Sequence, residues 1–103
     1  MNNKKYTIIY LPLFYKDLNK ITKYITKKLK NRIAADNLLT EVKQKIEKRA
    51  YSPTSYEIYS STKRKHIYYR LYIKNYIVFY IVKDNIMEVR RILYNKRNFY
   101  NII

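Results

Sequence analysis

Most side chains that could do chemistry in this 103-residue chain are cations, and few can exchange a proton. Lysine and arginine attract phosphate groups and can stabilise the negative charge that develops when a phosphodiester is attacked. That reaction also needs a general base and a proton donor, and the candidates for these two roles are His66, Tyr94 and Glu88. The candidate cations are Lys63, Arg64, Lys65, Arg70, Arg91, Lys96 and Arg97.

Each of these candidates also has a structural interpretation. A single histidine beside a basic loop is more often a plain surface residue than a phosphate ligand. Arg70 stands between Tyr68 and Tyr72 on an otherwise apolar stretch, so it needs an ion pair, a tyrosine ring or an external partner. Tyr94 has an ordinary pKa near 10 for its residue type, too high for an efficient base at neutral pH. No compact catalytic constellation emerges from the spacing alone.

Composition removes several classes of site. The chain has no cysteine, no glycine and one histidine, which excludes disulfides, a zinc site built by the protein alone and glycine-rich phosphate loops. The longest apolar run, residues 76–82, is far shorter than the roughly 20 residues of a membrane helix. We therefore expect one cytoplasmic domain spanning residues 1–103, with no membrane contact, no metal and no cofactor.

The charge balance points to an anionic partner. There are 23 Lys and Arg against 7 Asp and Glu, a formal net charge of +16. Such a field favours nucleic acid, a ribosome or a strongly acidic protein. A coding bias toward A/T-rich codons is the alternative source of the lysines, although it would not deplete Asp and Glu.

The stretch from residue 67 to residue 93 positions the candidates. It is rich in Ile, Val, Tyr and Phe, and polar breaks at residues 74–75 and 83–85 divide it into runs 67–73, 76–82 and 86–93. Asn and Asp tolerate positive φ in tight turns, so these runs predict an antiparallel three-stranded meander. The middle run is apolar on both faces and should be the buried strand, while Ile67, Tyr69, Leu71 and Ile73 should share one face.

The first half of the chain has a different period. Residues 6–11 predict a short strand that ends at Pro12 and joins the meander. Apolar side chains then recur at helical spacing in two segments, 14–30 and 33–49, with Asn31 as the expected stop of the first. The two inward stripes are Phe14, Leu18, Ile21, Ile25 and Leu29, then Ala34, Leu38, Leu39, Val42 and Ile46.

These elements predict an α+β fold: an N-terminal strand and an antiparallel helical hairpin packed on a four- to five-stranded, mainly antiparallel sheet. Residues 56–59 should add a short strand, and residues 60–65 a basic loop. The last residues, with two terminal isoleucines, are too short for an independent element and should pack against the domain.

Short motifs appear in a fixed order along the chain. They are Tyr10-Leu11-Pro12 with Asp17-Leu18, Ile21 and Tyr24-Ile25; Ala34 or Ala35 with Leu38; Tyr69-Arg70-Leu71; Asn75-Tyr76 with Phe79-Tyr80; and Val89 with Arg91-Ile92-Leu93-Tyr94 and Lys96-Arg97. This order resembles the RelE/ParE superfamily of toxins from type II toxin–antitoxin (plasmid stabilisation) systems. The resemblance covers nearly the whole chain, although no single motif is diagnostic.

Three departures bear on the activity that the resemblance implies. Leu13-Phe14-Tyr15 follows the first proline, where relatives often have a small residue. Tyr94 and Asn98 replace the histidine and aspartate of the closing motif, and Ile77 stands where RelE-like ribonucleases carry a catalytic arginine. The last departure favours a ParE-like, growth-inhibiting poison of DNA gyrase that is not an enzyme.

The excess positive charge favours the alternative, a RelE-like ribosome-dependent mRNA endonuclease. A third alternative is an inactive relative that only binds antitoxin.

The resemblance also implies partners. A cognate acidic antitoxin should neutralise the chain, within a higher-order toxin–antitoxin hetero-oligomer, and the target is DNA gyrase or the ribosome and its mRNA. The cations proposed to contact target or antitoxin are Lys63, Arg64, Lys65, Arg70, Arg91, Lys96 and Arg97. In a nuclease, the catalytic candidates are Arg70, Arg91, Tyr94, Arg97 and His66.

Overall fold

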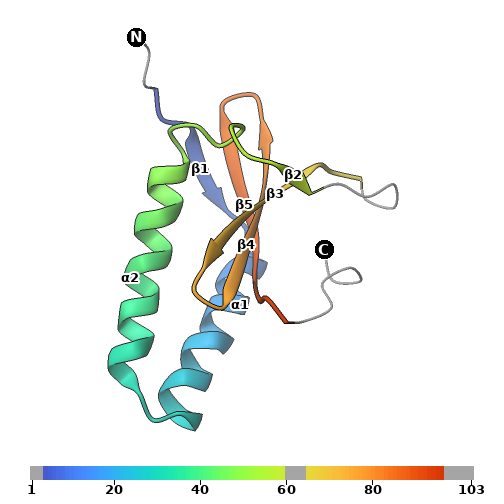
Figure 1. Cartoon of the computed structure of the whole chain (residues 1–103). Helices are drawn as coiled ribbons and strands as arrows, with labels where there is room; N and C mark the ends of the chain where they lie inside the picture. The colour runs from blue at the N-terminus through green and yellow to red at the C-terminus, as the bar shows by residue number, and fades with distance from the viewer. Residues whose placement is uncertain (1–3, 60–64, 97–103) are drawn as a thin grey trace.

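The computed structural model describes residues 4–59 and 65–96. Its elements follow one another as β1 (Thr7–Tyr10), α1 (Pro12–Lys23), a π-helical turn η1 (Tyr24–Lys28), α2 (Arg32–Arg49), β2 (Ile58–Tyr59), β3 (Tyr68–Ile73), β4 (Tyr76–Lys83) and β5 (Ile86–Tyr94) (Figure 1). The predicted α+β order of strand, helical hairpin and meander is confirmed.

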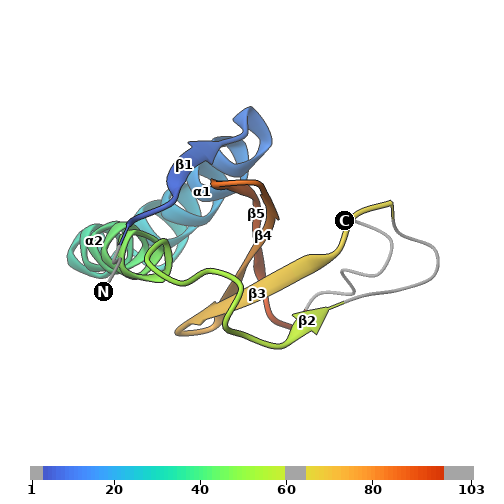
Figure 2. The same cartoon turned by 90° about the horizontal axis from the view of Figure 1, so that it is seen from above.

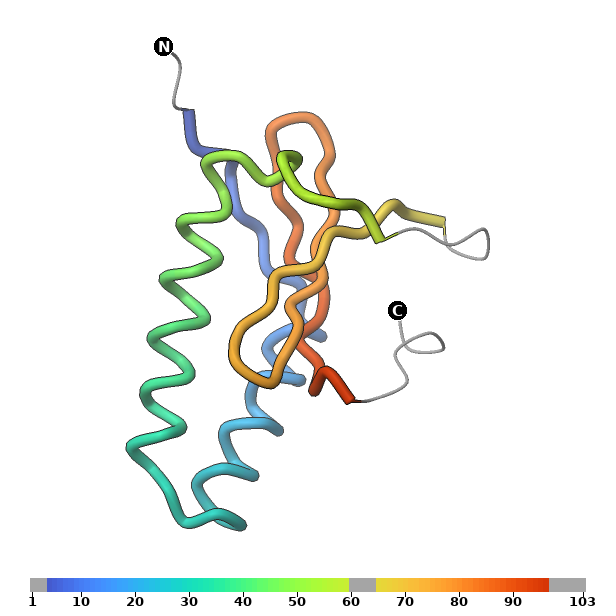
Figure 3. The backbone as a smooth tube through the Cα atoms, in the orientation of Figure 1, coloured from blue at the N-terminus to red at the C-terminus, as the bar shows by residue number. Residues whose placement is uncertain are grey.

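The five strands form one sheet in the order β1-β5-β4-β3-β2. β1 pairs with β5 in parallel, and every other pair is antiparallel. β4 is the central strand and is buried on both faces along most of its length, as its apolar sequence predicts. The tube in Figure 3 shows the two hairpins of the meander at opposite ends of the sheet.

Two-residue turns join the three long strands. Ile73 pairs with Tyr76 and Lys83 pairs with Ile86, so each turn has two residues between its strands. The first residue of each turn has positive φ, 53° at Lys74 and 54° at Asp84. The first turn therefore places a lysine, not the neighbouring asparagine, in the left-handed region, because tight hairpin geometry imposes that conformation on its first position.

Both helices pack on the same side of the sheet (Figure 2). Their inward side chains, including Phe14, Leu38 and Ile46, form the main core with Ile73 and Val78 of the sheet. The opposite side of the sheet, which we call the second face, carries a smaller buried cluster: Tyr68, Ile77, Phe79, Ile81 and Leu93. The alternation predicted for β3 is confirmed, since Tyr69, Leu71 and Ile73 face the helices and Tyr68 does not.

The helix boundaries differ from the prediction at the hairpin tip. The first helix starts earlier, with Pro12 in its first turn, where proline lacks only an N–H that has no helical partner. Lys30, with φ of 50°, supplies the left-handed residue that we expected at Asn31. Asn31 instead caps α2, because its side-chain oxygen accepts a hydrogen bond from Ala34 N–H at 3.0 Å.

Three apolar residues predicted to face inward are exposed. Leu29 is 57% exposed at the hairpin tip, which extends past the end of the sheet and leaves this side chain only partly covered (Figure 1). Leu39 borders a gap between the helices, and Ile67 precedes β3 instead of joining it. The strand predicted at residues 56–59 shortens to Ile58–Tyr59.

Candidate functional site

A β-bulge in β5 determines the directions of the Arg90 and Arg91 side chains. Phe79 of β4 pairs with Arg91 and the next residue, Tyr80, pairs with Val89, so Arg90 is the extra residue. A bulge of this kind bends the strand and re-aims its side chains. Arg90 and Arg91 consequently occupy two different environments, although they are adjacent in sequence.

Arg90 belongs to the second face and was not among the predicted site residues. Its Nη1 donates to Glu88 Oε2 at 2.5 Å, and its guanidinium carbon lies 5.9 Å from the centre of the Tyr68 ring. The sequence carried one indication of its position. Arg90 and Arg91 are adjacent in an apolar strand, and side chains of adjacent strand residues alternate between faces, so the two arginines should not share one polar face.

Arg70 lies on the same face and is held by aromatic rings. Its guanidinium carbon is 4.6 Å from the centre of the Tyr59 ring and 5.9 Å from that of Tyr72. Of the two structural interpretations of Arg70, stacking on tyrosine is the one observed. Stacking uses the flat face of the guanidinium, whereas its N–H donors point outward in the plane and remain suited to an anion.

His66 is half-buried near these arginines, with its ring 6.4 Å from and nearly perpendicular to the ring of Tyr68. Burial lowers the pKa of His66, and the positive charges of Arg90, Lys83 and Lys65 lower it further, against a smaller opposing effect of Glu88. A lowered pKa keeps the imidazole neutral at pH 7, the form that can accept a proton.

Arg91 is engaged by a carboxylate. Its Nε and Nη2 donate to the two oxygens of Asp17 at 2.6 and 2.8 Å, and Asp17 Oδ2 also accepts the backbone N–H of Ile92 at 3.2 Å. Both side chains are largely buried. Asp17 therefore joins α1 to β5 just past the point where β1 stops pairing with β5.

The remaining predicted candidates are dispersed. Tyr94 ends β5 on the helix side, with its ring 5.8 Å from that of Tyr76, and Lys96 is exposed just beyond it. Lys65 is exposed at the start of the segment that leads to His66. Lys63, Arg64 and Arg97 lie outside the described residues, as do Asn98 and the terminal isoleucines.

Sequence reasoning also missed a network centred on Arg49, at the end of α2. Its Nη1 donates to Tyr80 Oη at 3.0 Å and to the carbonyl of Arg70 at 3.1 Å, and its guanidinium carbon lies 3.4 Å from the centre of the Tyr56 ring. Tyr80 donates in turn to the carbonyl of Pro53 at 2.7 Å. The network ties the backbone that carries Arg70 to α2 and to the loop after it. Because its members are far apart in sequence, no local motif could predict it.

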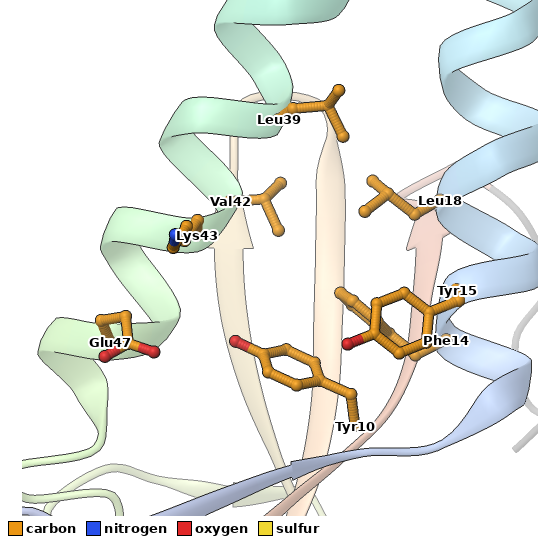
Figure 4. A pocket seen from close by; sticks show the side chains of 8 residues that line it. All are labelled: Tyr10, Phe14, Tyr15, Leu18, Leu39, Val42, Lys43 and Glu47. Carbon is orange, nitrogen blue, oxygen red and sulfur yellow. The ribbon is translucent and has the colours of Figure 1, made fainter.

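An apolar cavity of about 240 Å³ opens between the two helices, above β1. Figure 4 shows Leu18, Leu39 and Val42 turned into it, and the Tyr10 hydroxyl directed toward Glu47. Burial raises the pKa of Tyr10 to about 12, with smaller contributions from Glu47 and Tyr15. The Tyr10 hydroxyl is therefore neutral at physiological pH and acts as a hydrogen-bond donor or acceptor, not as a base.

Within residues 4–59 and 65–96, no three His, Cys, Asp or Glu side chains gather closely enough to hold a metal ion. Neither described helix is long and apolar enough to cross a bilayer.

Comparison with known proteins places this geometry in a family. A family model described as the ParE toxin of the type II toxin–antitoxin system, parDE, matches residues 8–99. The structure is similar to a chain of the RelB–RelE antitoxin–toxin complex from Methanococcus jannaschii, with a TM-score of 0.51 and 19% sequence identity over 92% of this chain and 99% of that one. At that identity the likeness shows a shared fold. No curated protein matches the sequence. Because the family model spans nearly the whole chain, the protein belongs to the ParE toxin family of type II toxin–antitoxin systems.

Proposed function

We propose that this toxin inhibits DNA gyrase by binding it, without catalysing a reaction, and that an acidic antitoxin neutralises it. The observation that carries the proposal is the environment of Ile77, which stands where RelE-like ribonucleases carry a catalytic arginine. Ile77 is 2% exposed and packs inside the second-face cluster with Phe79 and Leu93. A buried aliphatic side chain offers a phosphate neither charge nor a hydrogen bond, so this position contributes nothing to phosphodiester cleavage.

The dispersal of the other candidates supports the same proposal. Arg91 forms hydrogen bonds with Asp17 at the sheet edge, whereas Tyr94 lies on the helix side near Tyr76. General acid–base chemistry needs its groups within hydrogen-bond reach of one substrate. A binding function has no such requirement. In this proposal Arg70 contacts the target from the second face, and Arg91, Lys96 and Arg97 supply further contacts to target or antitoxin.

A supercoiling assay with purified DNA gyrase tests the proposal. Wild-type toxin should inhibit supercoiling, purified antitoxin should restore it, and Arg70→Ala should weaken inhibition at least tenfold. Lys43→Ala, which removes a cation from α2 on the other side of the molecule, is the matched control and should inhibit like the wild type. Full supercoiling in the presence of excess, correctly folded wild-type toxin would refute the gyrase proposal.

The second candidate function is a ribosome-dependent mRNA endonuclease, and one observation favours it. His66 is neutral at pH 7 and lies on the same face as Arg70 and Arg90, so a proton acceptor and phosphate-binding cations coincide there. A translating extract separates the two functions. An endonuclease would cut message that is being translated, and His66→Gln would lose that activity. An inactive relative would do neither, yet still bind antitoxin.

We propose that the antitoxin uses the cavity between the helices. Tyr15 and Leu39 line it and are exposed, which suits an apolar anchor, and the net charge of +16 suits carboxylates around that anchor. The RelB–RelE structure that shares this fold is an antitoxin–toxin complex. Co-expression with the adjacent small open reading frame should raise soluble yield and abolish toxicity, because binding stabilises the folded state. A chain that is harmless alone and unaffected by that neighbour would contradict this assignment.

A further inference from the structure

A second and larger cavity lies at the opposite end of the molecule from the one in Figure 4. Its volume is about 510 Å³, within the range of small-molecule sites. It opens between the far end of the helical hairpin and the end of the sheet that carries the β3–β4 turn. We call it the tyrosine pocket; its lining residues are Lys20, Ile21, Tyr24, Leu29, Asn75, Tyr76 and Tyr94.

Three tyrosine rings from three different elements form its walls. Tyr24 of η1 is 55% exposed and Tyr94 at the end of β5 is 40% exposed, so both present ring surface to a ligand. Tyr76 is half-buried, and the centre of its ring lies 5.8 Å from that of Tyr94 with an angle of 62° between the rings. Exposed aromatic faces that converge on one hollow are stacking platforms for flat, unsaturated rings.

The polar groups of the pocket suit the edge of such a ring. The Asn75 side chain offers a donor and an acceptor together. The backbone that carries it is held in place, because the backbone N–H of Asn95 donates to the backbone carbonyl of Asn75 at 2.8 Å. Burial raises the pKa of Tyr76, and the nearby tyrosines Tyr94 and Tyr24 add to the shift. The Tyr76 hydroxyl therefore keeps its proton and does not bring negative charge into the pocket.

The charges around the tyrosine pocket favour an anionic ligand. None of its seven lining residues is acidic, whereas the cavity between the helices contains Glu47. Lys20 lines it, and the same helical segment carries Lys23, Lys27 and Lys28, none of which forms an ion pair within the described part of the chain. A ligand with a flat heterocycle and an attached phosphate suits the tyrosine rings, the Asn75 amide and Lys20 together.

We infer that the tyrosine pocket binds a base of single-stranded nucleic acid, with the base stacked on Tyr24 and Tyr94 and the adjoining phosphates on Lys20 and its neighbours. The inference stands on this pocket alone and is independent of gyrase inhibition. DNA and RNA share the chemistry on which it depends, because both offer a stacking base and a phosphate.

Fluorescence anisotropy with labelled ten-nucleotide strands tests the inference on the full-length chain. The strands are DNA, RNA and an abasic DNA of the same length, which keeps the phosphates and removes the bases. Because a chain of charge +16 binds any polyanion, the difference between base-containing and abasic strands is the informative quantity. Whichever of DNA and RNA binds more tightly identifies the preferred source of the base.

Tyr24→Ala and Tyr94→Ala should each weaken binding of the base-containing strand by roughly 5- to 150-fold and leave abasic binding unchanged. Tyr51→Ala, a 55% exposed tyrosine far from the pocket, is the matched control and should change neither. Lys20→Gln should weaken both strands and reduce the salt dependence by about one phosphate contact. Both tyrosines in the pocket variants are exposed, so the substitutions leave the core intact, and circular dichroism verifies folding.

Three results would overturn the inference. Equal affinity of wild-type chain for base-containing and abasic strands would mean that only phosphates are bound. A loss with Tyr51→Ala as large as that with Tyr94→Ala would mean that no particular pocket is involved. If a glutamate-rich peptide with one phenylalanine depended on Tyr24 and Tyr94 while the oligonucleotides did not, the pocket would belong to a protein partner.

Discussion

The two faces of the sheet both have apolar centres, but the contacts that hold their charged side chains differ. On the helix side, Asp17 accepts three hydrogen bonds from Arg91 and Ile92, and Arg49 donates to Tyr80 and a backbone carbonyl. On the second face, the guanidinium groups of Arg70 and Arg90 lie over tyrosine rings. Two residues depart from this division, since Arg90 also donates to Glu88 and the Arg49 guanidinium also lies over the Tyr56 ring. The contrast is sharpest between Arg91, held by Asp17 in directional hydrogen bonds, and Arg70, held by its flat surface.

This difference separates stability from recognition. A hydrogen-bonded, largely buried ion pair is costly to break, since either partner alone is left as an uncompensated charge. A partly exposed cation over aromatic rings contributes less to folding, and the in-plane N–H groups of Arg70 remain suited to an anionic partner. The following substitutions test that division, beginning with the largest expected effect.

Asp17→Asn should lower the free energy of unfolding by about 3 kcal/mol, because it leaves Arg91 largely buried without its counter-charge. Urea denaturation measures the change. Asp36→Asn, an exposed position on α2, is the control and should change stability by less than about 0.5 kcal/mol. A loss below about 1 kcal/mol for Asp17→Asn would mean that the pair does not hold α1 to β5.

Tyr80→Phe should cost about 1–3 kcal/mol, because it removes the acceptor of Arg49 and the donor to the buried Pro53 carbonyl while keeping the ring. The matched control is Tyr69→Phe, whose ring stacks on that of Tyr80 at 5.3 Å. It removes a hydroxyl but no hydrogen bond that the structure describes, so its unfolding midpoint should stay near that of the wild type. Equal losses in the two variants would rule out a special role for the Tyr80 hydroxyl.

Arg70→Ala should lower the free energy of unfolding by about 1 kcal/mol, within the range for a partly exposed cation over aromatic rings. Arg70→Lys tests whether the planar shape of the guanidinium matters, because it keeps the charge and loses the planar stacking group. A loss from Arg70→Ala as large as that from Asp17→Asn would make Arg70 a structural residue and remove the contrast between the faces.

The smallest effect concerns His66, the only histidine in the chain and thus a clean NMR probe. Its pKa should lie below 6.5, and Lys83→Gln should raise it, whereas Lys43→Gln on α2 should not. Because the folded state disfavours the charged imidazole, stability should fall as pH drops through 6.5 toward the lowered pKa, and His66→Gln should remove that dependence. A pKa at or above 6.5 would place His66 away from these cations.

The order and type of most elements followed from sequence because their signals are local. Helical and alternating periods, the polar turns and Pro12 each act over a few residues, and the predicted elements and mainly antiparallel sheet are confirmed. The hairpin tip was predicted less well, since Asn31 suits either a left-handed stop or an N-cap and sequence alone does not rank the two.

The candidate site was less predictable because its geometry depends on contacts between distant residues. Asp17 and Arg91 are 74 positions apart, and only the assembled edge of β5 brings them together. The bulge at Arg90 depends on the register between β4 and β5, which no period in either strand determines. Sequence identified Arg70 and His66 as residues of interest, but Arg90 emerged only once the two strands were paired.

The most direct test of the proposed function maps mRNA ends and chromosomal DNA breaks in the same cells, sampled soon after expression of the wild-type chain and of Arg70→Ala and Arg91→Ala. Arg91→Ala also reports on folding, so only protein that accumulates to wild-type level is compared. A gyrase poison predicts early DNA breaks and an induced damage response, both reduced in Arg70→Ala, with no new ends in translated messages. Codon-phased mRNA cleavage that precedes any DNA damage and disappears in Arg70→Ala would contradict the account and establish the endonuclease instead.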